Sequence, residues 1–481
     1  MKFNMKRTKI VCTIGPATKD INIIKEMIRS GMNVARINFS HGAYVDQKEY
    51  IDNIKQAREE LKIPVALLLD TQGPKIRTGK LENGSVELDD GAEIVLTNKE
   101  MLGNKDIVSV DYIDMYKDVQ IGDTILIADG KMKLIVEKIQ REDIYCKIIN
   151  GGTLGERKSI NIPGVNLNLP ALDEKDIQDI KDGCKAEFDY VSASFVRCAQ
   201  DIKEIRKLLD ENGGKGIKII AKIECEQGLE NIDEIVEESD GIMIARGDLG
   251  VEIPLEVVPL MQKKLIKMCN RSGKIVITAT QMLESMTESP RPTRAEVSDV
   301  ANAIYDGTGA IMLSGESAIG KYPVECVDTM SKIANMVESD INYWKRFDNN
   351  EFDSTNLNYE FNLNHSICLT AKEMKVKAIV SYTEGGDTPR TIASFLPECP
   401  IYTITSNEMT YRQMALGWGI TPILIKEEDA TPKDLISIGI EQLKKDGVIL
   451  PGDIIAIAGG NLIVENSKNV INRTIGGVLR I

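Results

Sequence analysis

Residues 219–228 read IIAKIECEQG, an apolar run that is interrupted by Lys222 and Glu224. In a β-strand, side chains two residues apart point to the same side, so this cation and this anion would share one face of a strand. Residues 241–250, GIMIARGDLG, repeat the same spacing of a basic and an acidic residue after another apolar run. We therefore expect two buried strands that end in charged side chains.

Similar segments rich in Val and Ile recur along the chain, and amphipathic stretches separate most of them. The stretches at 199–213 and 255–273 have helical spacing of apolar residues and end at glycine, a common helix stop. Alternating strands and helices indicate a parallel sheet, and about eight repeats favour a closed (β/α)8 barrel, the TIM barrel. The eight expected strands lie at 9–15, 33–40, 64–73, 190–197, 217–224, 241–248, 274–281 and 309–316.

The alternation is interrupted after the third expected strand. Residues 74–170 are β-rich and contain the hairpin-like pairs Asn83-Gly84, Asp90-Gly91 and Asp129-Gly130. We interpret 74–170 as an inserted all-β domain, a small β-barrel that acts as a lid over the mouth of the larger barrel. Residues 1–73 and 171–345 would then form the catalytic (β/α)8 barrel. A polar and irregular linker, residues 342–364, would lead into 346–481, a C-terminal α/β domain with an open sheet.

Composition excludes several classes of protein. The net charge of −14 argues against a nucleic-acid partner. No segment approaches the roughly 20 apolar residues of a membrane span, and the basic N-terminus has no apolar core of signal-peptide length, so we expect a cytoplasmic protein. Nine dispersed cysteines show no zinc-ligand spacing, and two histidines make a histidine-based mechanism improbable.

Charged and hydroxyl side chains recur where the expected strands end, and in (β/α)8 enzymes the active site lies at those ends. A single polar residue there is ordinary, and a Lys–Glu pair can be a plain ion pair. Buried ion pairs contribute little net stability, however, and six strand ends with such groups favour a functional site. The residues in question are Arg36, Asn38, Ser40, Asp70, Thr71, Lys222, Glu224, Arg246, Asp248, Thr278, Thr280, Ser314 and Glu316.

The chemistry of these groups suits a hard cation next to a phosphorylated ligand. Glu224 and Asp248, without His or Cys partners, favour oxygen coordination of Mg²⁺ or Mn²⁺. Lys222, Arg36 and Arg77 add positive charge, as expected for phosphoryl transfer. No GxxxxGK[ST] segment is present, so a nucleotide would not be held by a P-loop.

Several long segments resemble one known family. They are TKIVCTIGPAT (8–18), ARINFSHG (35–42), LLLDTQGPKIRTG (67–79), VSASFVR (191–197), AKIECEQGLEN (221–231), IMIARGDLGVEIP (242–254), TATQMLESM (278–286) and the long run at 290–325. In this order they resemble the pyruvate kinase family over essentially the whole chain. The resemblance implies transfer of the phosphoryl group from phosphoenolpyruvate to ADP, giving pyruvate and ATP, the last step of glycolysis.

The resemblance also implies a role for each matching residue. Glu224 and Asp248 would hold the divalent metal, while Lys222 would neutralise charge on the transferred phosphoryl group. Thr280 or a bound water would protonate enolpyruvate. The remaining implied residues are Arg36 for substrate phosphate; Gly247, Asp248 and Thr280 for the substrate carboxylate; Asn38, Ser40, Asp70 and Thr71 for K⁺; and Asn38, Phe39, Ser40, His41, Arg77 and Lys158 for the nucleotide. A homotetramer would be typical of the family.

The C-terminal domain resembles the family's effector domain but departs from it at one loop. Residues 382–391 read YTEGGDTPRT, with two acids where members activated by fructose 1,6-bisphosphate carry basic and hydroxyl residues. The tail, 458–481, lacks the usual Gly-Thr-Thr-Asn run. We therefore expect AMP, a sugar monophosphate or no effector at this loop, which comprises Thr383, Glu384, Gly385, Gly386, Asp387 and Thr388.

Two other functions stay open at this point. A metal-dependent lyase or aldolase acting on phosphoenolpyruvate or pyruvate would also place Glu and Asp on a divalent ion. It would not need the lid or the nucleotide-matching Arg77 and Lys158. A non-catalytic metabolite sensor is the third possibility, although the complete set of catalytic-type residues argues against it: Lys222, Glu224, Asp248 and Thr280.

Overall fold

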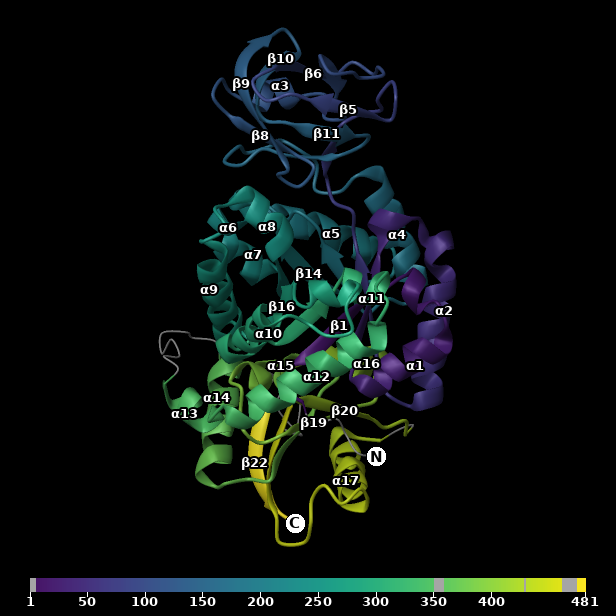
Figure 1. Ribbon diagram of the computed structural model, residues 1–481. Helices are drawn as coiled ribbons and strands as arrows, with labels where there is room; N and C mark the ends of the chain where they lie inside the picture. The colour runs from purple at the N-terminus through teal and green to yellow at the C-terminus, as the bar shows by residue number, and fades with distance from the viewer. Residues whose placement is uncertain (1–5, 350–358, 428–429, 461–473) are drawn as a thin grey trace.

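Eight parallel strands close into a barrel at the centre of the computed structural model, which describes residues 6–349, 359–427, 430–460 and 474–481 (Figure 1). The order around the barrel is β1-β17-β16-β15-β14-β13-β3-β2. All eight strands predicted from the sequence are present, which confirms the fold class. Their bounds are β1 (Lys9–Ile14), β2 (Val34–Asn38), β3 (Ala66–Asp70), β13 (Tyr190–Ala193), β14 (Lys218–Ile223), β15 (Gly241–Ala245), β16 (Ile275–Ala279) and β17 (Ala310–Leu313).

Helices surround the barrel because each one turns an apolar stripe toward the outer face of the strands. Local signals fix their ends: the Thr293 hydroxyl and the Glu296 carboxylate form a capping box on α10, and Gly307 ends that helix at φ +97°. The main helices are α1 (Ile21–Ser30), α2 (Tyr44–Leu61), α4 (Glu174–Lys185), α5 (Ala199–Glu211), α7 (Ile232–Glu238), α9 (Val258–Arg271), α10 (Arg294–Asp306) and α12 (Pro323–Asp340). Shorter ones are η1 (Pro16–Thr18), η2 (Phe39–His41), α6 (Glu226–Glu230), α8 (Arg246–Glu252), η3 (Glu284–Thr287) and α11 (Gly315–Ala318).

The inserted segment is a β structure with its own apolar core, at one end of the barrel (Figure 1). Gly84, Gly91 and Gly130 have φ between +75° and +80°, the left-handed conformation that the predicted turns require. The curled sheet has the order β4-β12-β8-β9-β10-β6-β7, and β11 pairs with β5. The bounds are β4 (Ile76–Arg77), β5 (Ser85–Leu88), β6 (Glu93–Thr97), β7 (Ile107–Ser109), α3 (Met115–Asp118), β8 (Thr124–Ile127), β9 (Met132–Gln140), β10 (Asp143–Asn150), β11 (Gly152–Gly155) and β12 (Ser159–Asn161).

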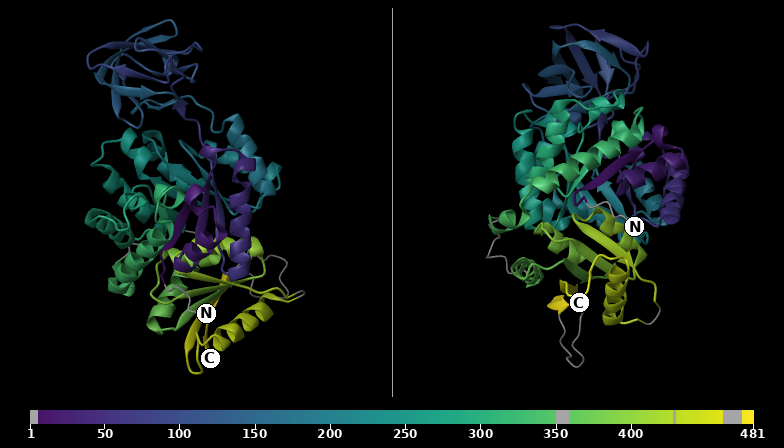
Figure 2. Two further views of the ribbon diagram at one scale, coloured as in Figure 1. Left: turned by 45° about the vertical axis from the view of Figure 1, so that its right-hand side comes forward. Right: turned by 60° about the horizontal axis from the view of Figure 1, so that its bottom comes forward.

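The C-terminal part is an open α/β sheet of order β20-β19-β18-β21-β22, at the opposite end of the barrel from the lid (Figures 1 and 2). Its strands are β18 (Ala378–Tyr382), β19 (Ile401–Thr405), β20 (Ile420–Leu424), β21 (Ile454–Gly460) and the antiparallel β22 (Thr474–Arg480). Its helices are α13 (Tyr343–Asn349), α14 (Tyr359–Glu373), α15 (Asp387–Ser394), α16 (Glu408–Gln413), η4 (Met414–Leu416) and α17 (Pro432–Lys445).

The structure departs from the sequence prediction on both sides of residues 350–358. The polar segment expected as an irregular linker is helical on both sides of residues 350–358, because α13 and α14 bury aromatic side chains such as Phe347 and Phe361. The prediction that it is irregular is therefore wrong for these flanks. The missing Gly-Thr-Thr-Asn run concerns a tail whose residues 461–473 lie outside the described part of the chain. We keep the domain boundaries near residues 74, 170 and 346 as a proposal.

The C-terminal domain closes the barrel at the ends where its strands begin. Leu416 packs among the apolar side chains of the barrel interior, and the Tyr190 hydroxyl donates a 2.7 Å hydrogen bond to the Gln413 carbonyl. Lys9 also donates from Nζ to the Ile420 carbonyl at 2.8 Å. The open end of the barrel therefore faces the lid. Within the described ranges, no helix combines the length and the apolar composition of a membrane span.

Candidate active site

A cavity of about 640 Å³ occupies the lid-facing end of the barrel, where the strands finish. Six of the eight strands contribute residues to its lining. Each of these strands either ends in a lining residue or leads into a loop that contains one. The sequence-predicted residues that line it are Arg36, Asn38, His41, Lys222, Glu224, Asp248, Thr280 and Ser314. The expected convergence of charged and hydroxyl groups at this end of the barrel is therefore present.

Lys222 is a buried cation at the floor of this cavity. Its Nζ atom lies 3.0 Å from Glu224 Oε1 and 3.4 Å from Asp70 Oδ1, and it donates a 2.7 Å hydrogen bond to the Ser194 hydroxyl. Burial alone would lower the pKa of Lys222, but the neighbouring carboxylates outweigh it and raise that pKa. The ammonium therefore keeps its charge inside the protein.

Arg36 is fixed beside Lys222 through a shared carboxylate. Its Nε and Nη2 atoms donate to Asp70 Oδ2 at 3.1 and 2.5 Å, and Nη1 donates to the Thr13 hydroxyl at 2.7 Å. Burial alone would raise the pKa of Asp70, but Arg36 and Lys222 hold it below its ordinary value. Asp70 thus bridges two cations that both line the cavity, where an anionic ligand would meet them.

Glu224 and Asp248 present two carboxylates to the same cavity. Glu224 Oε2 accepts a 2.7 Å hydrogen bond from the Phe195 amide, while its buried Oε1 atom has no well-aligned donor. Burial raises the pKa of Glu224, whereas Lys75, 3.2 Å from Asp248 Oδ1, helps to hold the pKa of Asp248 below its ordinary value against burial. Glu224 Oε1 pairs with Lys222 Nζ at 3.0 Å, and a buried carboxylate oxygen without an aligned donor keeps a lone pair that suits a metal ligand.

Arg246 does not share a strand face with Asp248, so that sequence interpretation is wrong. Strand β15 ends at Ala245, and both residues lie in the first turn of α8. The Arg246 guanidinium instead donates to the Thr280 carbonyl at 2.7 Å and to Asp299 Oδ1 at 2.8 Å. Arg246 thus fixes the backbone at the end of β16. It does not line the cavity, whereas Asp248 does.

Thr280 has an unusual backbone for a β-branched residue, with φ at +69°. Its hydroxyl accepts a 2.8 Å hydrogen bond from the Gly247 amide and donates to the Ala279 carbonyl at 2.6 Å. Strained positions of this kind cluster at functional sites. Thr278, two residues earlier, is buried against the Thr308 hydroxyl and is not among the residues that line the cavity.

The four residues expected to bind K⁺ come from two neighbouring strand ends. Asn38 and Asp70 are register partners on β2 and β3. Asn38 Oδ1 accepts a 3.1 Å hydrogen bond from the Ser40 amide, and the Thr71 hydroxyl accepts one of 3.0 Å from the Ser194 amide. The structure brings these residues together, although Asp70 already pairs with two protein cations.

The residues expected to contact the nucleotide divide into two groups. His41 lines the barrel cavity, whereas the Phe39 ring is buried against Phe188, which leaves the Phe39 backbone for a ligand. Arg77 and Lys158 lie in the lid, where Arg77 pairs in register with Ser159. Arg77 lines a separate hollow of about 660 Å³ in the lid, so the lid cations are not part of the barrel cavity here.

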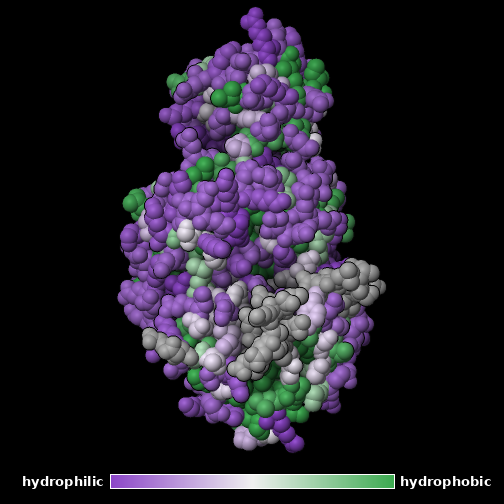
Figure 3. Space-filling view, turned by 180° about the vertical axis from the view of Figure 1, so that it is seen from behind, coloured by the Kyte–Doolittle hydropathy of each residue, from purple (hydrophilic) through white to green (hydrophobic). Residues whose placement is uncertain are grey.

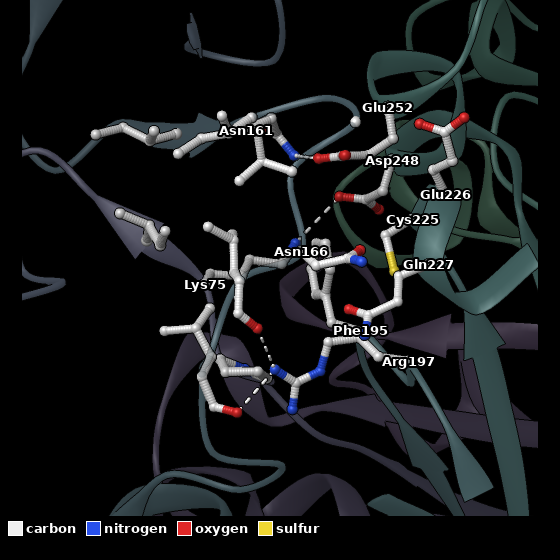
Figure 4. Close-up of a pocket in the computed structure, with 18 of the residues that line it drawn as sticks. Lys75, Asn161, Asn166, Phe195, Arg197, Cys225, Glu226, Gln227, Asp248 and Glu252 are labelled. Atoms are coloured by element: carbon white, nitrogen blue, oxygen red, sulfur yellow. Dashed lines mark hydrogen bonds and ion pairs between the residues drawn. The ribbon is translucent and has the colours of Figure 1, made fainter. Parts of the chain in front are cut away.

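A smaller cavity of about 120 Å³ separates the base of the lid from the barrel (Figure 4). Polar contacts cross it: Asn161 Nδ2 donates to Glu252 Oε1 at 2.6 Å, and Arg197 Nη1 donates to the Leu169 carbonyl at 2.7 Å. Lys75 also reaches across to Asp248 (Figure 4). These contacts set the orientation of the lid above the mouth of the barrel.

Sequence reasoning missed three residues of the site: Thr13, Lys75 and Ser194. Each belongs to a segment that resembles the family. Period-two spacing along 190–194 puts Ser192 and Ser194 on one face, so Ser194 carried a signal of its own. Lys75 carried none, because it follows the end of a strand and its position depends on the lid.

The effector-type loop is held by contacts within itself. The Thr383 hydroxyl accepts a 2.8 Å hydrogen bond from the Gly386 amide, and Gly386 has φ at +86°. Arg390, the one basic residue of 382–391, donates from Nη2 to Asp387 Oδ1 at 2.6 Å and to the Gly385 carbonyl at 2.9 Å, while its buried Nη1 atom has no hydrogen-bond partner in the described structure. The loop therefore already engages one nitrogen of the cation that an anionic effector would need.

Comparison with known proteins places this geometry in a family. A family model described as the pyruvate kinase barrel domain matches residues 5–327, and one described as the pyruvate kinase alpha/beta domain matches residues 362–472. The chain belongs to the pyruvate kinase family. Pyruvate kinase activity, a phosphotransferase reaction of glycolysis, follows from a likeness that spans both domains and 95% or more of this chain in the relatives below.

Similar proteins cover nearly all of the chain. A pyruvate kinase from Clostridium acetobutylicum is 46% identical over 461 residues, which are 95% of this chain and 96% of that protein. One from Bacillus licheniformis is 45% identical over 469 residues, 97% of this chain and 80% of that protein. The crystal structure of a Cryptosporidium parvum pyruvate kinase superposes with a TM-score of 0.92 at 37% identity, covering 100% of this chain and 97% of that one.

Proposed function

We propose that the barrel cavity transfers the phosphoryl group of phosphoenolpyruvate to ADP, giving pyruvate and ATP. The observation that carries this proposal is the buried, protonated Lys222 between Asp70 and Glu224, with Arg36 beside it and Asp248 lining the same cavity. Such a site supplies fixed positive charge where a phosphoryl group needs it, without reorganisation during the reaction.

Glu224 and Asp248 would hold Mg²⁺ or Mn²⁺. Both offer oxygen ligands, and Glu224 Oε1, which pairs with Lys222 but accepts no aligned hydrogen bond, fits this use. Over the ranges that the structure describes, no three His, Cys, Asp or Glu side chains group into a metal site, so the remaining ligands would come from substrate and water. When bound, the ion would neutralise substrate oxygens and orient them for in-line transfer.

The chain's own residues then have distinct tasks. Arg36 binds the phosphate of phosphoenolpyruvate, and Lys222 stabilises the negative charge on the phosphoryl oxygens as the bond to the enol oxygen breaks and the bond to the ADP oxygen forms. Gly247, Asp248 and Thr280 face the carboxylate end of the substrate. The Thr280 hydroxyl, or a water next to it, delivers the proton that converts enolpyruvate to pyruvate.

The nucleotide would lie between the barrel and the lid. Asn38, the Phe39 backbone, Ser40 and His41 would meet it from the barrel, and Arg77 and Lys158 from the lid. Since those two lid residues are outside the barrel cavity in this structure, we propose that the lid closes when the nucleotide binds.

A monovalent cation, K⁺, is proposed at the oxygens of Asn38, Ser40, Asp70 and Thr71. Asp70 already shares its charge with Arg36 and Lys222. The gain from K⁺ is therefore expected to be modest, and comparing the rate in KCl with the rate in tetramethylammonium chloride measures it. Equal rates in the two salts would remove K⁺ from the proposal.

We propose a homotetramer on the basis of two exposed apolar faces. Leu260 on α9, Val297 on α10 and Leu255 just before α9 are exposed. Tyr359, Leu369, Val478 and Leu479 are exposed on α14 and the adjoining strand β22, the last strand in the order of the described C-terminal sheet. Figure 3 shows hydrophobic residues gathered on that end of the molecule. Two self-complementary faces on one chain generate a tetramer, which light scattering would detect.

The effector-type loop (Thr383, Glu384, Gly385, Gly386, Asp387 and Thr388) is proposed to bind AMP or a sugar monophosphate, or no effector. Its two acids and its self-paired Arg390 favour a ligand with a single phosphate. We also propose a cytoplasmic location, which suits nine cysteines that are all free thiols.

One assay tests the proposed activity against its alternatives. Pyruvate release from phosphoenolpyruvate is measured with and without ADP and Mg²⁺. ADP-dependent release supports the kinase, whereas ADP-independent release would indicate the lyase or aldolase. No release under any condition would indicate the sensor.

A further inference from the structure

The first turn of α4 lies between two segments that carry residues of the proposed site. One segment is the short helix η2, which contains Ser40 and His41. The other is the loop that follows β3 and leads into the lid. Two consecutive residues of α4, Lys175 and Asp176, hold one loop each, and neither lines the barrel cavity.

The Lys175 side chain donates hydrogen bonds to backbone carbonyls at both ends of η2. Its Nζ atom donates to the Phe39 carbonyl at 2.6 Å and to the Gly42 carbonyl at 3.1 Å, and its third contact is to Asp179 Oδ2 at 2.5 Å. An ammonium has three donors, so all of them are used. The two carbonyls lie on either side of Ser40 and His41 in the chain. This one side chain therefore fixes the position and orientation of the turn that carries both residues.

Asp176 holds the other loop with both carboxylate oxygens. Oδ1 accepts a 2.8 Å hydrogen bond from the Gln72 amide, and Oδ2 accepts one of 3.0 Å from the Gly73 amide. The carboxylate is fully buried and no cation pairs with it in the described structure. Burial and the nearby Asp173 raise the pKa of Asp176 to about 6, so keeping an acid at this position costs stability.

Gly73 connects Asp176 to the cation of the site. Gly73 has φ at +74° and packs so closely on Ser194 that a Cβ atom at position 73 would lie 2.7 Å from the Ser194 Cβ. Ser194 in turn accepts the hydrogen bond from Lys222 and donates to the Thr71 carbonyl at 2.7 Å. A shift of the loop at Gly73 would therefore displace the Ser194 hydroxyl, which orients the Lys222 ammonium.

A role in helix capping does not explain these contacts. Asp173 already caps α4, since its Oδ1 accepts a 2.7 Å hydrogen bond from the Asp176 amide. The Asp176 side chain points to the loop after β3 instead of its own helix. Lys175 does form an i,i+4 pair with Asp179, but two of its three donors go to η2.

We propose that Lys175 and Asp176 are positioning residues of the active site, Lys175 for the nucleotide-contacting turn and Asp176 for the loop that sets Ser194 and, through it, Lys222. The inference deepens the proposed function and rests on it. It predicts that the two residues affect different steps, because the loops that they hold meet different substrates.

Steady-state kinetics with each substrate varied in turn tests this division. Lys175→Met should raise the KM for ADP about tenfold and leave the KM for phosphoenolpyruvate unchanged. Lys175→Arg, which keeps a cationic donor, should recover part of the loss. Asp176→Asn should lower kcat about tenfold with binding of Mn²⁺ unchanged. The matched controls, Lys185→Met and Asp182→Asn, break a surface ion pair on the same helix and should behave as the wild type.

Amide hydrogen exchange gives a readout that does not depend on activity. Exchange should accelerate at residues 40–43 in Lys175→Met and at residues 72–73 in Asp176→Asn, with the rest of the barrel unchanged. If the wild type is active but Lys175→Met leaves the ADP KM unchanged, or if a control variant matches its effect, the inference is overturned by itself. A wild type without ADP-dependent pyruvate release would overturn the proposed function, and the inference with it.

Discussion

The Nζ atom of Lys222 lies 2.7 Å from the hydroxyl of Ser194, across the paired strands β14 and β13. The other two neighbours of this ammonium, Asp70 and Glu224, are carboxylates and attract it from different sides. Ser194 is the neutral partner, and its hydrogen bond fixes where the third N–H can point. The position of the site's central cation is thus set by three side chains from three strand ends.

Replacing Lys222 with methionine should lower kcat by about three orders of magnitude, because the buried positive charge that faces the phosphoryl group is lost. Binding of Mn²⁺, followed by electron paramagnetic resonance, should persist, since Glu224 and Asp248 remain. Lys218→Met is the matched control, since Lys218 pairs with Asp240 at the start of the same strand. Near-normal turnover of Lys222→Met would contradict the role assigned to Lys222.

Replacing Ser194 with alanine should lower kcat about tenfold, because one charge-assisted hydrogen bond to Lys222 is removed. The KM for ADP should not change, since Ser194 does not line the barrel cavity. Ser331→Ala is the control, because that buried hydroxyl donates to the Ser30 carbonyl at 2.6 Å outside the site. Equal kcat values for Ser194→Ala and the control would show that Ser194 does not orient Lys222.

The barrel could be predicted from the sequence because its signal is local and repeated. Each strand is a short apolar run, and each run ends in a polar residue that must emerge from the sheet. The lid was recognisable for a related reason, since turns such as Asn83-Gly84 require a residue with positive φ. Glu224 and Asp248 could be paired from the sequence because parallel strands end at one edge.

Contacts made by distant segments were beyond the same reasoning. Arg246 was interpreted as a strand residue because nothing local marks the end of β15 at Ala245; its actual partners are the Thr280 carbonyl and Asp299. Lys75 reaches Asp248 because the lid places it there. The helices α13 and α14 form in a polar segment because aromatic residues such as Phe347 bury themselves against the C-terminal sheet. Tertiary packing decided each of these positions.

The buried Lys9 makes the free energy of unfolding depend on pH in the alkaline range. Burial lowers the pKa of Lys9 to about 8, although Glu338 opposes this, and in an unfolded chain a lysine titrates near pH 10.4. Between about pH 8 and 10 the unfolded chain binds more protons than the folded one, so the free energy of unfolding contributed by this group rises with pH. Lys9→Met removes that dependence. Its melting temperature relative to the wild type should therefore fall steadily as the pH increases over this range.

Thermal unfolding of both proteins at a series of pH values measures the difference. Loss of the hydrogen bond to the Ile420 carbonyl shifts the melting temperature of Lys9→Met at every pH. The slope of the difference in melting temperature against pH reports the titration of Lys9. Lys445→Met, at an exposed lysine of α17, is the control and should follow the wild type at every pH. A difference between Lys9→Met and the wild type that stays constant with pH would contradict the lowered pKa.

Fructose 1,6-bisphosphate should not bind the effector-type loop with micromolar affinity. Glu384 and Asp387 place negative charge at the loop, and Arg390 is the one basic residue of 382–391; its Nη2 atom pairs with Asp387 and the Gly385 carbonyl and its Nη1 atom is buried, so two phosphates would have to share one guanidinium there. Isothermal titration with fructose 1,6-bisphosphate, AMP and a sugar monophosphate measures the three affinities in parallel. Asp387→Asn, which releases Arg390, should tighten binding of a phosphate ligand, whereas Asp446→Asn on the exposed end of α17 should not. Micromolar binding of the bisphosphate to the wild type would contradict this account, because two phosphates would require more positive charge than the single arginine of residues 382–391 supplies.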